Sequence, residues 1–219
     1  MRRNGRRLAI GMMVTLLLAA GLSLTGVQAY ALDIDTPRNA GERVLALSGR
    51  FLQNEAERVA AVLRAVGPFD VVTFDSTGGS VLGAIEVGEL LRREGLATRI
   101  ESGRTCSSAC LFAFAGGRHR QVERGGRVGV HRATLTGNEE RIAAVVAAAR
   151  SGDHGAVVRA IGRFEQASTA AATAQMQHLN DMGISVRLMA LHVEVDHDAM
   201  HWLTPEELRS FAVVNALED

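Results

Sequence analysis

The sequence has few aromatic residues, few cysteines and no excess of charge of either sign. Its 219 residues include one tryptophan, one tyrosine and two cysteines, and the formal net charge at pH 7 is zero. Few aromatic side chains are available to stack on bases or sugars, and the balanced charge gives no reason to expect a nucleic-acid partner. A single pair of cysteines also disfavours a zinc site, because four-cysteine sites need a second pair.

The first 31 residues have the pattern of an export signal. Four arginines precede an apolar run over residues 8–24, and Val27, Ala29 and Ala31 offer small side chains at cleavage positions. The run is also near the lower length limit for crossing a bilayer, so an uncleaved anchor is the alternative. In either case we expect the rest of the chain to be periplasmic or secreted, or anchored to the inner membrane through residues 8–24.

After the signal, short apolar runs alternate with helical patterns. The pattern predicts strands at residues 44–47, 71–74, 97–101 and 127–130, and helices at residues 54–66, 81–94 and 109–115. Strands that alternate with helices indicate an α/β fold with a mostly parallel sheet.

The domain organisation follows from changes in composition. We expect residues 32–43, which are polar and contain Pro37, to be a linker, and residues 44–219 to form one domain. An alanine-rich stretch at about 138–182 predicts a helical arm. Such an arm either packs against a partner subunit or covers the active cleft of its own chain.

Three local expectations complete the secondary structure. Thr204, Pro205 and Glu207 predict the capped start of a helix. Residues 212–214 predict a closing strand. The basic residues 118–120 predict an exposed, solvated turn.

Residues capable of chemistry follow three of the predicted strands. Gly78 and Gly79 lie in a turn before a helix, where main-chain amides can face negative charge. Ser107 and Ser108 precede the next helix, and His131 ends the following strand. Together they predict an anion-binding turn, a nucleophile and a general base. Taken singly, each has a structural explanation as a tight turn, a helix cap or a buried histidine.

The two cysteines, Cys106 and Cys110, flank the serines. In an oxidising compartment this pair predicts a disulfide. The spacing of four is near the upper part of the range that a disulfide can bridge, so the alternative is two small buried thiols behind the turn.

The motifs around these residues resemble a known family. Residues 74–80 (FDSTGGS) resemble the S-x-G-G turn of the Clp protease proteolytic subunit, ClpP, and of signal peptide peptidase A. Residues 106–110 (CSSAC) resemble the C-x-S-A-C nucleophile turn of exported ClpP-like proteins, and Val130-His131 resembles the histidine at a strand end in that family. Residues 202–208 resemble the segment before the last strand of the family.

The resemblance implies both a fold and a set of roles. The fold is the ClpP/crotonase-like spiral of β-β-α units. Ser108 is implied as the nucleophile, His131 as the base, and the amides of Gly79 and Ala109 as the oxyanion hole. No cofactor or metal is required by this chemistry.

The sequence departs from the family pattern in two places. Without gaps, Met200 stands where the catalytic acid of ClpP would be. Asp198 is our first substitute, Asp196 and Asp181 follow, and a Ser–His dyad is the remaining alternative. Counting from the flanking glycines favours Ser107 as the nucleophile, but a small residue directly follows Ser108, as the signature requires.

The sequence therefore predicts a serine peptidase, or a related acyl hydrolase, that acts on peptides or proteins and forms a homo-oligomer. One alternative is the same fold without catalysis, serving as a binding or assembly module. A second alternative is a metal site drawn from the polar cluster near the C-terminus: His192, Glu194, Asp196, His197, Asp198 and His201.

Overall fold

The computed structural model of the chain describes residues 31–39, 41–134 and 139–215. The predicted export signal, residues 1–31, lies outside the described residues except for Ala31. Within the described ranges, no helix has the length and apolar character that a membrane crossing requires.

Parallel strands form the centre of the sheet. The strands β3 (Glu42–Phe51), β4 (Val71–Gly79), β6 (Thr105–Ser107) and β8 (Arg127–Val130) are neighbours in that order, and each pair runs parallel. β9 (His201–Trp202) is antiparallel to β8. β3, β4 and β8 contain predicted apolar runs, whereas β6 was not predicted, because the run predicted before the serine turn, residues 97–101, forms the separate strand β5 (Ala97–Ile100). The α/β class is confirmed.

The chain winds so that two strands share one edge of β4. β5 (Ala97–Ile100) pairs with the first half of β4, whereas β6 pairs with β4 further along, at Ser76. β7 (Arg120–Val122) continues from β5 and β8 continues from β6. The sheet therefore divides beyond β4 into two branches, and the β6–β8 branch carries the serine and histidine motifs.

Residues 33–39 belong to the sheet, in place of the expected linker. β1 (Asp33–Asp35) and β2 (Arg38–Asn39) both pair antiparallel with β3. Just before β1, Leu32 is buried and its amide donates to the carboxylate of Glu55, which is itself buried. The local sequence is polar because β1 lies at the edge of the sheet, where only backbone pairing is required.

Helices cover the sheet and build the core. α1 (Glu55–Val66), α2 (Val81–Arg93) and α3 (Cys110–Ala115) follow the predicted helices closely. Every residue of α3 is buried, and α2 packs against it. The Ser80 side chain caps α2 by accepting from the amide of Gly83 at 3.2 Å. A tightly packed α2–α3 pair therefore lies behind the turn that leaves β6.

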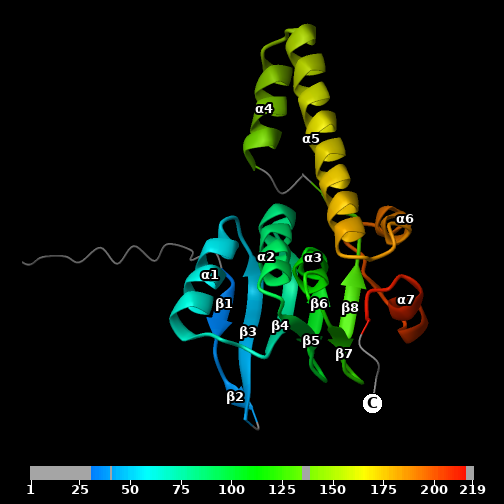
Figure 1. Cartoon of the computed structure of the whole chain (residues 1–219). Coiled ribbons are helices and arrows are strands. Elements are labelled where there is room, and N and C mark those ends of the chain that lie inside the picture. The colour runs from blue at the N-terminus through cyan, green and yellow to red at the C-terminus, as the bar shows by residue number, and fades with distance from the viewer. Residues whose placement is uncertain (1–30, 40, 135–138, 216–219) are drawn as a thin grey trace, which may run out of the picture.

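The stretch expected to form an arm contains two helices, α4 (Glu139–Arg150) and α5 (His154–Asp181). They form a hairpin that projects from the rest of the domain (Figure 1). α4 has no buried residue, and α5 buries mainly residues near its C-terminal end, including Gln175, His178 and Leu179. Only this end of α5 is therefore part of the core.

The C-terminal segment contains α6 (Leu188–Glu194) and α7 (Pro205–Ser210). The predicted cap is present, because Thr204 accepts from the Glu207 amide while the Glu207 carboxylate accepts from the Thr204 amide. The strand predicted at residues 212–214 is wrong. Ala212 has a φ of 55°, which breaks an extended conformation, and Val213 is buried in the core.

Arg120 is buried, contrary to the predicted exposed turn. Its side chain is 2% exposed, and burial lowers its pKa to about 10. The guanidinium donates hydrogen bonds of 2.9–3.1 Å to four main-chain carbonyls, those of Gly117, Met182, Ala212 and Val213. Arg120 therefore ties the C-terminal segment to the end of α3, which explains how this segment packs without forming a strand.

We expect Arg120→Met to lower the free energy of unfolding by about 3 kcal/mol, because it leaves buried carbonyls without donors. Arg118→Met is the matched control, since Arg118 is exposed on the same turn, and it should change stability by less than about 0.5 kcal/mol. Urea denaturation measures both. Equal effects of the two variants would contradict a structural role for the Arg120 contacts.

Candidate functional site

The predicted site residues follow the carboxyl ends of three neighbouring parallel strands. Ser76 of β4 is paired with Cys106 of β6, and Ser107 of β6 is paired with Gly129 of β8. The glycine turn ends β4, Ser108 follows β6 and His131 follows β8. Ligand sites in parallel sheets lie at this edge. The fold therefore brings the three motifs to one end of the sheet.

Ser108 occupies a sharp turn between β6 and α3. Its φ is 57°, in the left-handed region that residues other than glycine rarely adopt. Its amide donates to the carbonyl of Gly129 at 2.9 Å. Ser108 is half-buried, whereas Ser107 lies within β6 and is 4% exposed. Of the two serines, Ser108 has the strained, more accessible geometry that is found where nucleophiles are presented.

The glycine turn lies directly against the serine turn. A Cβ added to Gly78 would come within 2.7 Å of the Ser108 Cβ and 2.9 Å of the Ala109 nitrogen. The Gly78 amide donates to the hydroxyl of Ser76 at 3.1 Å, which holds the turn. Gly79 has a φ of 130° and lies against the main chain of Phe51. Only glycine allows this close approach of the β4 end to the serine.

The Ala109 amide is the second predicted oxyanion donor. Ala109 precedes the first residue of α3 and is buried beside the serine turn. Within the described part of the chain, its N–H donates to no protein acceptor. An unpaired buried amide is costly and rare in folded proteins. This amide is therefore available to a substrate oxygen.

A disulfide closes the serine turn. Cys106 and Cys110 are bonded, with Cα atoms 5.3 Å apart, and both residues are fully buried. The predicted pair thus exists, and the alternative of two free thiols does not apply. The bond joins the end of β6 to the start of α3, so it restricts the backbone on both sides of Ser108.

His131 has no acidic partner among the described residues. Its Nδ1 atom is buried and forms no hydrogen bond, and no hydrogen bond joins it to the hydroxyl of Ser108. The Met200 sulfur packs close to Gly129, beside the expected position of the acid. Catalytic hydrogen bonds are often incomplete until substrate binds, so the missing serine contact does not remove His131 as the base.

None of the three acid candidates is hydrogen-bonded to His131 in the described part of the chain. Asp198, the first substitute, is exposed. Asp196 forms an ion pair with Arg132 at 2.7 Å. Asp181 is exposed at the end of α5 and accepts from the Asn180 side chain at 3.4 Å.

The polar residues considered for a metal site are dispersed. His192 is buried in α6, His201 pairs with Glu207 at 3.0 Å, and His197 is exposed. In the ranges that the structure describes, no three side chains of the ligating types lie close enough to hold a metal ion.

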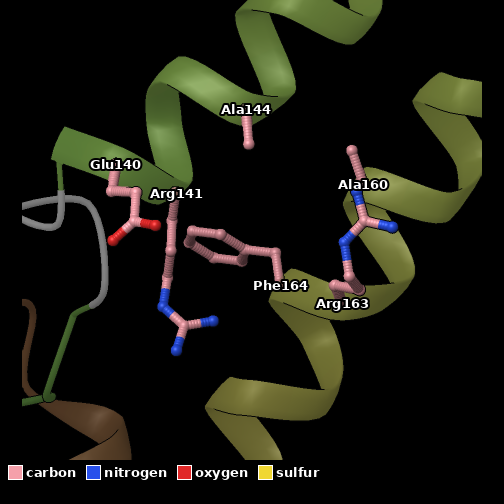
Figure 2. Close-up of a pocket in the computed structure, with 6 residues that line it drawn as sticks. All are labelled: Glu140, Arg141, Ala144, Ala160, Arg163 and Phe164. Carbon is pink, nitrogen blue, oxygen red and sulfur yellow. The ribbon is translucent and has the colours of Figure 1, made fainter.

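Two cavities lie near the arm. One, of about 290 Å³, is lined only by residues of α4 and α5, and the Phe164 ring points across it toward Arg141 (Figure 2). Because no strand end contributes to it, we assign it no part in catalysis. The other, of about 190 Å³, is lined by residues that directly follow His131, together with parts of α5 and α6.

Comparison with known proteins supports the fold. No protein-family model and no curated protein matches the chain. Among solved structures, the chain is similar to a ClpP1 mutant from Listeria monocytogenes, with 14% sequence identity and a TM-score of 0.53. The similarity covers 78% of this chain and 88% of that one. The predicted ClpP-like fold is confirmed, and at this identity the likeness concerns the fold alone.

We expect replacement of both Cys106 and Cys110 by alanine to lower the free energy of unfolding by roughly 2 kcal/mol, the chain-entropy value for so short a loop. Urea denaturation without reductant measures the loss. As a control, the wild-type disulfide should resist mild reductant under native conditions because both cysteines are fully buried. An unchanged unfolding midpoint in the double variant would show that the bond does not constrain this turn.

Proposed function

We propose that the protein is a serine peptidase, or a closely related acyl hydrolase, that acts on peptides in an exported compartment. The observation that carries the proposal is the Ser108 turn, in which a serine with positive φ lies at the meeting point of three parallel strand ends. The ClpP-like fold supports it, and the predicted export signal supports the periplasmic or secreted location.

In this mechanism, the Ser108 hydroxyl oxygen attacks the substrate carbonyl carbon while His131 takes the hydroxyl proton. The amides of Ala109 and Gly79, with Gly78 packed beside the serine, stabilise the oxyanion. The C–N bond then breaks, and His131 gives its proton to the leaving amine. A water molecule, deprotonated by His131, hydrolyses the resulting ester and restores Ser108.

We further propose that the catalytic residues work as a Ser–His dyad. No carboxylate in the described ranges is hydrogen-bonded to the Nδ1 atom of His131, and Met200, which stands at the acid position in the sequence comparison, packs its sulfur close to Gly129. Loss of the orienting acid lowers kcat by about four orders of magnitude in a triad enzyme. We therefore expect slow turnover.

The missing acidic partner of His131 also favours a second candidate function, a catalytically inactive binding or assembly module with this fold. The two candidates differ in whether the Ser108 oxygen is activated as a nucleophile. A probe that reacts with activated serines therefore separates them.

We expect a fluorophosphonate probe to label the wild-type protein and to leave Ser108→Ala unlabelled. The labelling rate of His131→Ala should be at least about a hundredfold lower than that of the wild-type protein, as expected for loss of a general base. Ser107→Ala should keep most of the labelling. His197→Ala is the matched histidine control, because His197 is exposed outside the site.

The opposite results are equally informative. Loss of labelling in Ser107→Ala, with Ser108→Ala still labelled, would move the nucleophile by one residue. If the folded wild-type protein stays unlabelled, the binding module becomes the better description.

We also propose that the arm mediates a homo-oligomer. Five large apolar side chains of the described hairpin are 37–56% exposed, those of Ile142, Val146, Val158, Ile161 and Met176. Exposed apolar residues gathered on a projecting element are typical of association surfaces. Among the described residues, the arm packs on the domain mainly through one end of α5, so much of its surface can contact another subunit.

For this surface we expect the double variant Val158→Glu/Ile161→Glu to shift the protein toward the monomer in light scattering after size exclusion. Buried charge at an interface is strongly unfavourable, so the shift should be complete at micromolar concentration. Gln166→Glu, which adds a similar charge to α5, should keep the wild-type mass. A monomeric wild-type protein would rule out the proposal.

A further inference from the structure

The cavity beside His131 has three walls. Arg132 and Ala133 continue the chain from His131, Ala171 and Gln175 face it from α5, and Met189 and His192 face it from α6. In Figure 1, α6 lies beside the C-terminal end of α5. The Arg132 amide donates to the carbonyl of Val195 at 2.8 Å, which fixes the first wall against the end of α6. The cavity therefore opens next to the proposed catalytic base.

The volume of the cavity limits what it can hold. At about 190 Å³ it is smaller than the roughly 300 Å³ at which pockets for drug-sized ligands begin. It is close to an engineered cavity of about 150 Å³ that binds benzene. The cavity thus suits a single amino-acid side chain.

His192 gives the cavity its chemical character. The residue is 3% exposed, lines the cavity, and neither of its ring nitrogens has a hydrogen-bond partner. Its ring packs near Phe112, with centroids 5.9 Å apart, which fixes its position. A buried polar group without a partner is energetically unfavourable, so a ligand that satisfies it binds more tightly.

His192 is neutral at physiological pH. Burial lowers the pKa of His192 to about 4, and the charge of the neighbouring His131 adds to this effect, whereas a weaker contact with the His131 main chain opposes it. A neutral imidazole has one donor and one acceptor nitrogen. Its natural partner is a group that both donates and accepts, such as a carboxamide or a hydroxyl.

The other polar residues around the cavity do not favour a charged ligand. Arg132, the one charged residue that lines it, is already paired with Asp196 at 2.7 Å. The Gln175 amide nitrogen donates to the Ala171 carbonyl of its own helix at 3.1 Å. None of the described residues that line the cavity carries a carboxylate that could receive a cationic side chain.

We propose that this cavity binds one uncharged, hydrogen-bonding side chain of the substrate, next to the bond that is cleaved, and that His192 is the residue that selects it. The inference rests on the proposed peptidase function, because it places the cavity beside the catalytic base. To that function the inference adds a class of substrate. The substrates are peptides that have a carboxamide or hydroxyl side chain next to the cleaved bond.

The test measures binding separately from catalysis. Full-length Ser108→Ala protein is titrated with fluorescein-labelled peptides of the form Ala-Ala-X-Ala-Ala, and fluorescence polarisation gives each Kd. X is glutamine, methionine or glutamate, three side chains of similar size that differ in hydrogen bonding and charge. We expect the glutamine peptide to bind about threefold to tenfold more tightly than the methionine peptide, as one net hydrogen bond provides. It should also bind more tightly than the glutamate peptide.

Two variants in the same background locate the effect. His192→Phe keeps an aromatic ring but removes both nitrogens. The ratio of the Kd of the methionine peptide to the Kd of the glutamine peptide should therefore fall to about one. His197→Phe is the matched control, because this histidine is exposed and does not line the cavity, and it should keep the wild-type ratio. A circular dichroism spectrum that matches that of the parent protein shows that each variant is folded.

Each outcome has a separate meaning. Equal or tighter binding of the methionine peptide overturns the proposal, as does a preference that survives in His192→Phe or the absence of binding by all three peptides. If the fluorophosphonate probe labels Ser108 in these cases, the peptidase function stands and only the inference fails. If glutamine is preferred but labelling is absent, the cavity remains a peptide site and the catalytic function fails.

Discussion

The main-chain hydrogen bond from Ser108 to Gly129 holds the proposed site together. It extends the pairing of β6 and β8 by one residue past the end of the strand, at the point where the chain turns into α3. A positive φ at a residue other than glycine costs about 1–2 kcal/mol, so such a turn persists only when its surroundings enforce it. Here the Cys106–Cys110 disulfide closes the turn from behind, and Gly78 fills the space in front. Three contacts thus hold the main chain of the turn that carries Ser108.

The histidines around this turn differ in what satisfies them. His178 has a backbone partner, because its Nε2 atom lies 2.7 Å from the carbonyl of Phe112, and it links α5 to α3. His201 is paired with Glu207. His131, His178 and His192 each have a buried Nδ1 atom without a hydrogen-bond partner, and among the described histidines His192 is the one whose Nε2 atom is buried without a partner as well. His131 and His192 lie close enough for one to affect the other. Buried polar groups in proteins are normally hydrogen-bonded, so His192 indicates where a ligand would complete the structure.

The arm contributes both to the packed core of the domain and to its projecting surface. The C-terminal end of α5 is buried against α2 and α3 and forms one wall of the cavity beside His131. The rest of α5 and all of α4 project from the domain and expose apolar side chains. One continuous helix therefore connects the surface proposed for self-association to the pocket proposed for substrate. Any contact that moved the hairpin as a unit would also act on that wall.

The sequence by itself determined the strands β3, β4, β5 and β8 and the helices between them, because apolar periodicity, glycines and caps act over a few residues. The short strands β6 and β7 were not predicted. The sequence also indicated the three motifs that the parallel sheet brings together, since residues that follow neighbouring parallel strands must meet at one edge. It did not determine features that depend on distant partners. The polar residues of β1 become a strand only because β3 offers a free edge, and Arg120 is buried only because carbonyls from Met182, Ala212 and Val213 converge on it.

The surroundings of His131, the proposed catalytic base, show the same division between local pattern and tertiary contact. Local pattern identified His131, but only the tertiary structure placed the Met200 sulfur near Gly129 and left Asp198 exposed. In sequence, His192 was one of several polar residues in a C-terminal cluster. The fold buried it without a partner beside a cavity, because α5, α6 and the segment after β8 come together there. Backbone preference is local and can be read along the chain, whereas burial and hydrogen-bond partners belong to contacts between elements far apart in sequence.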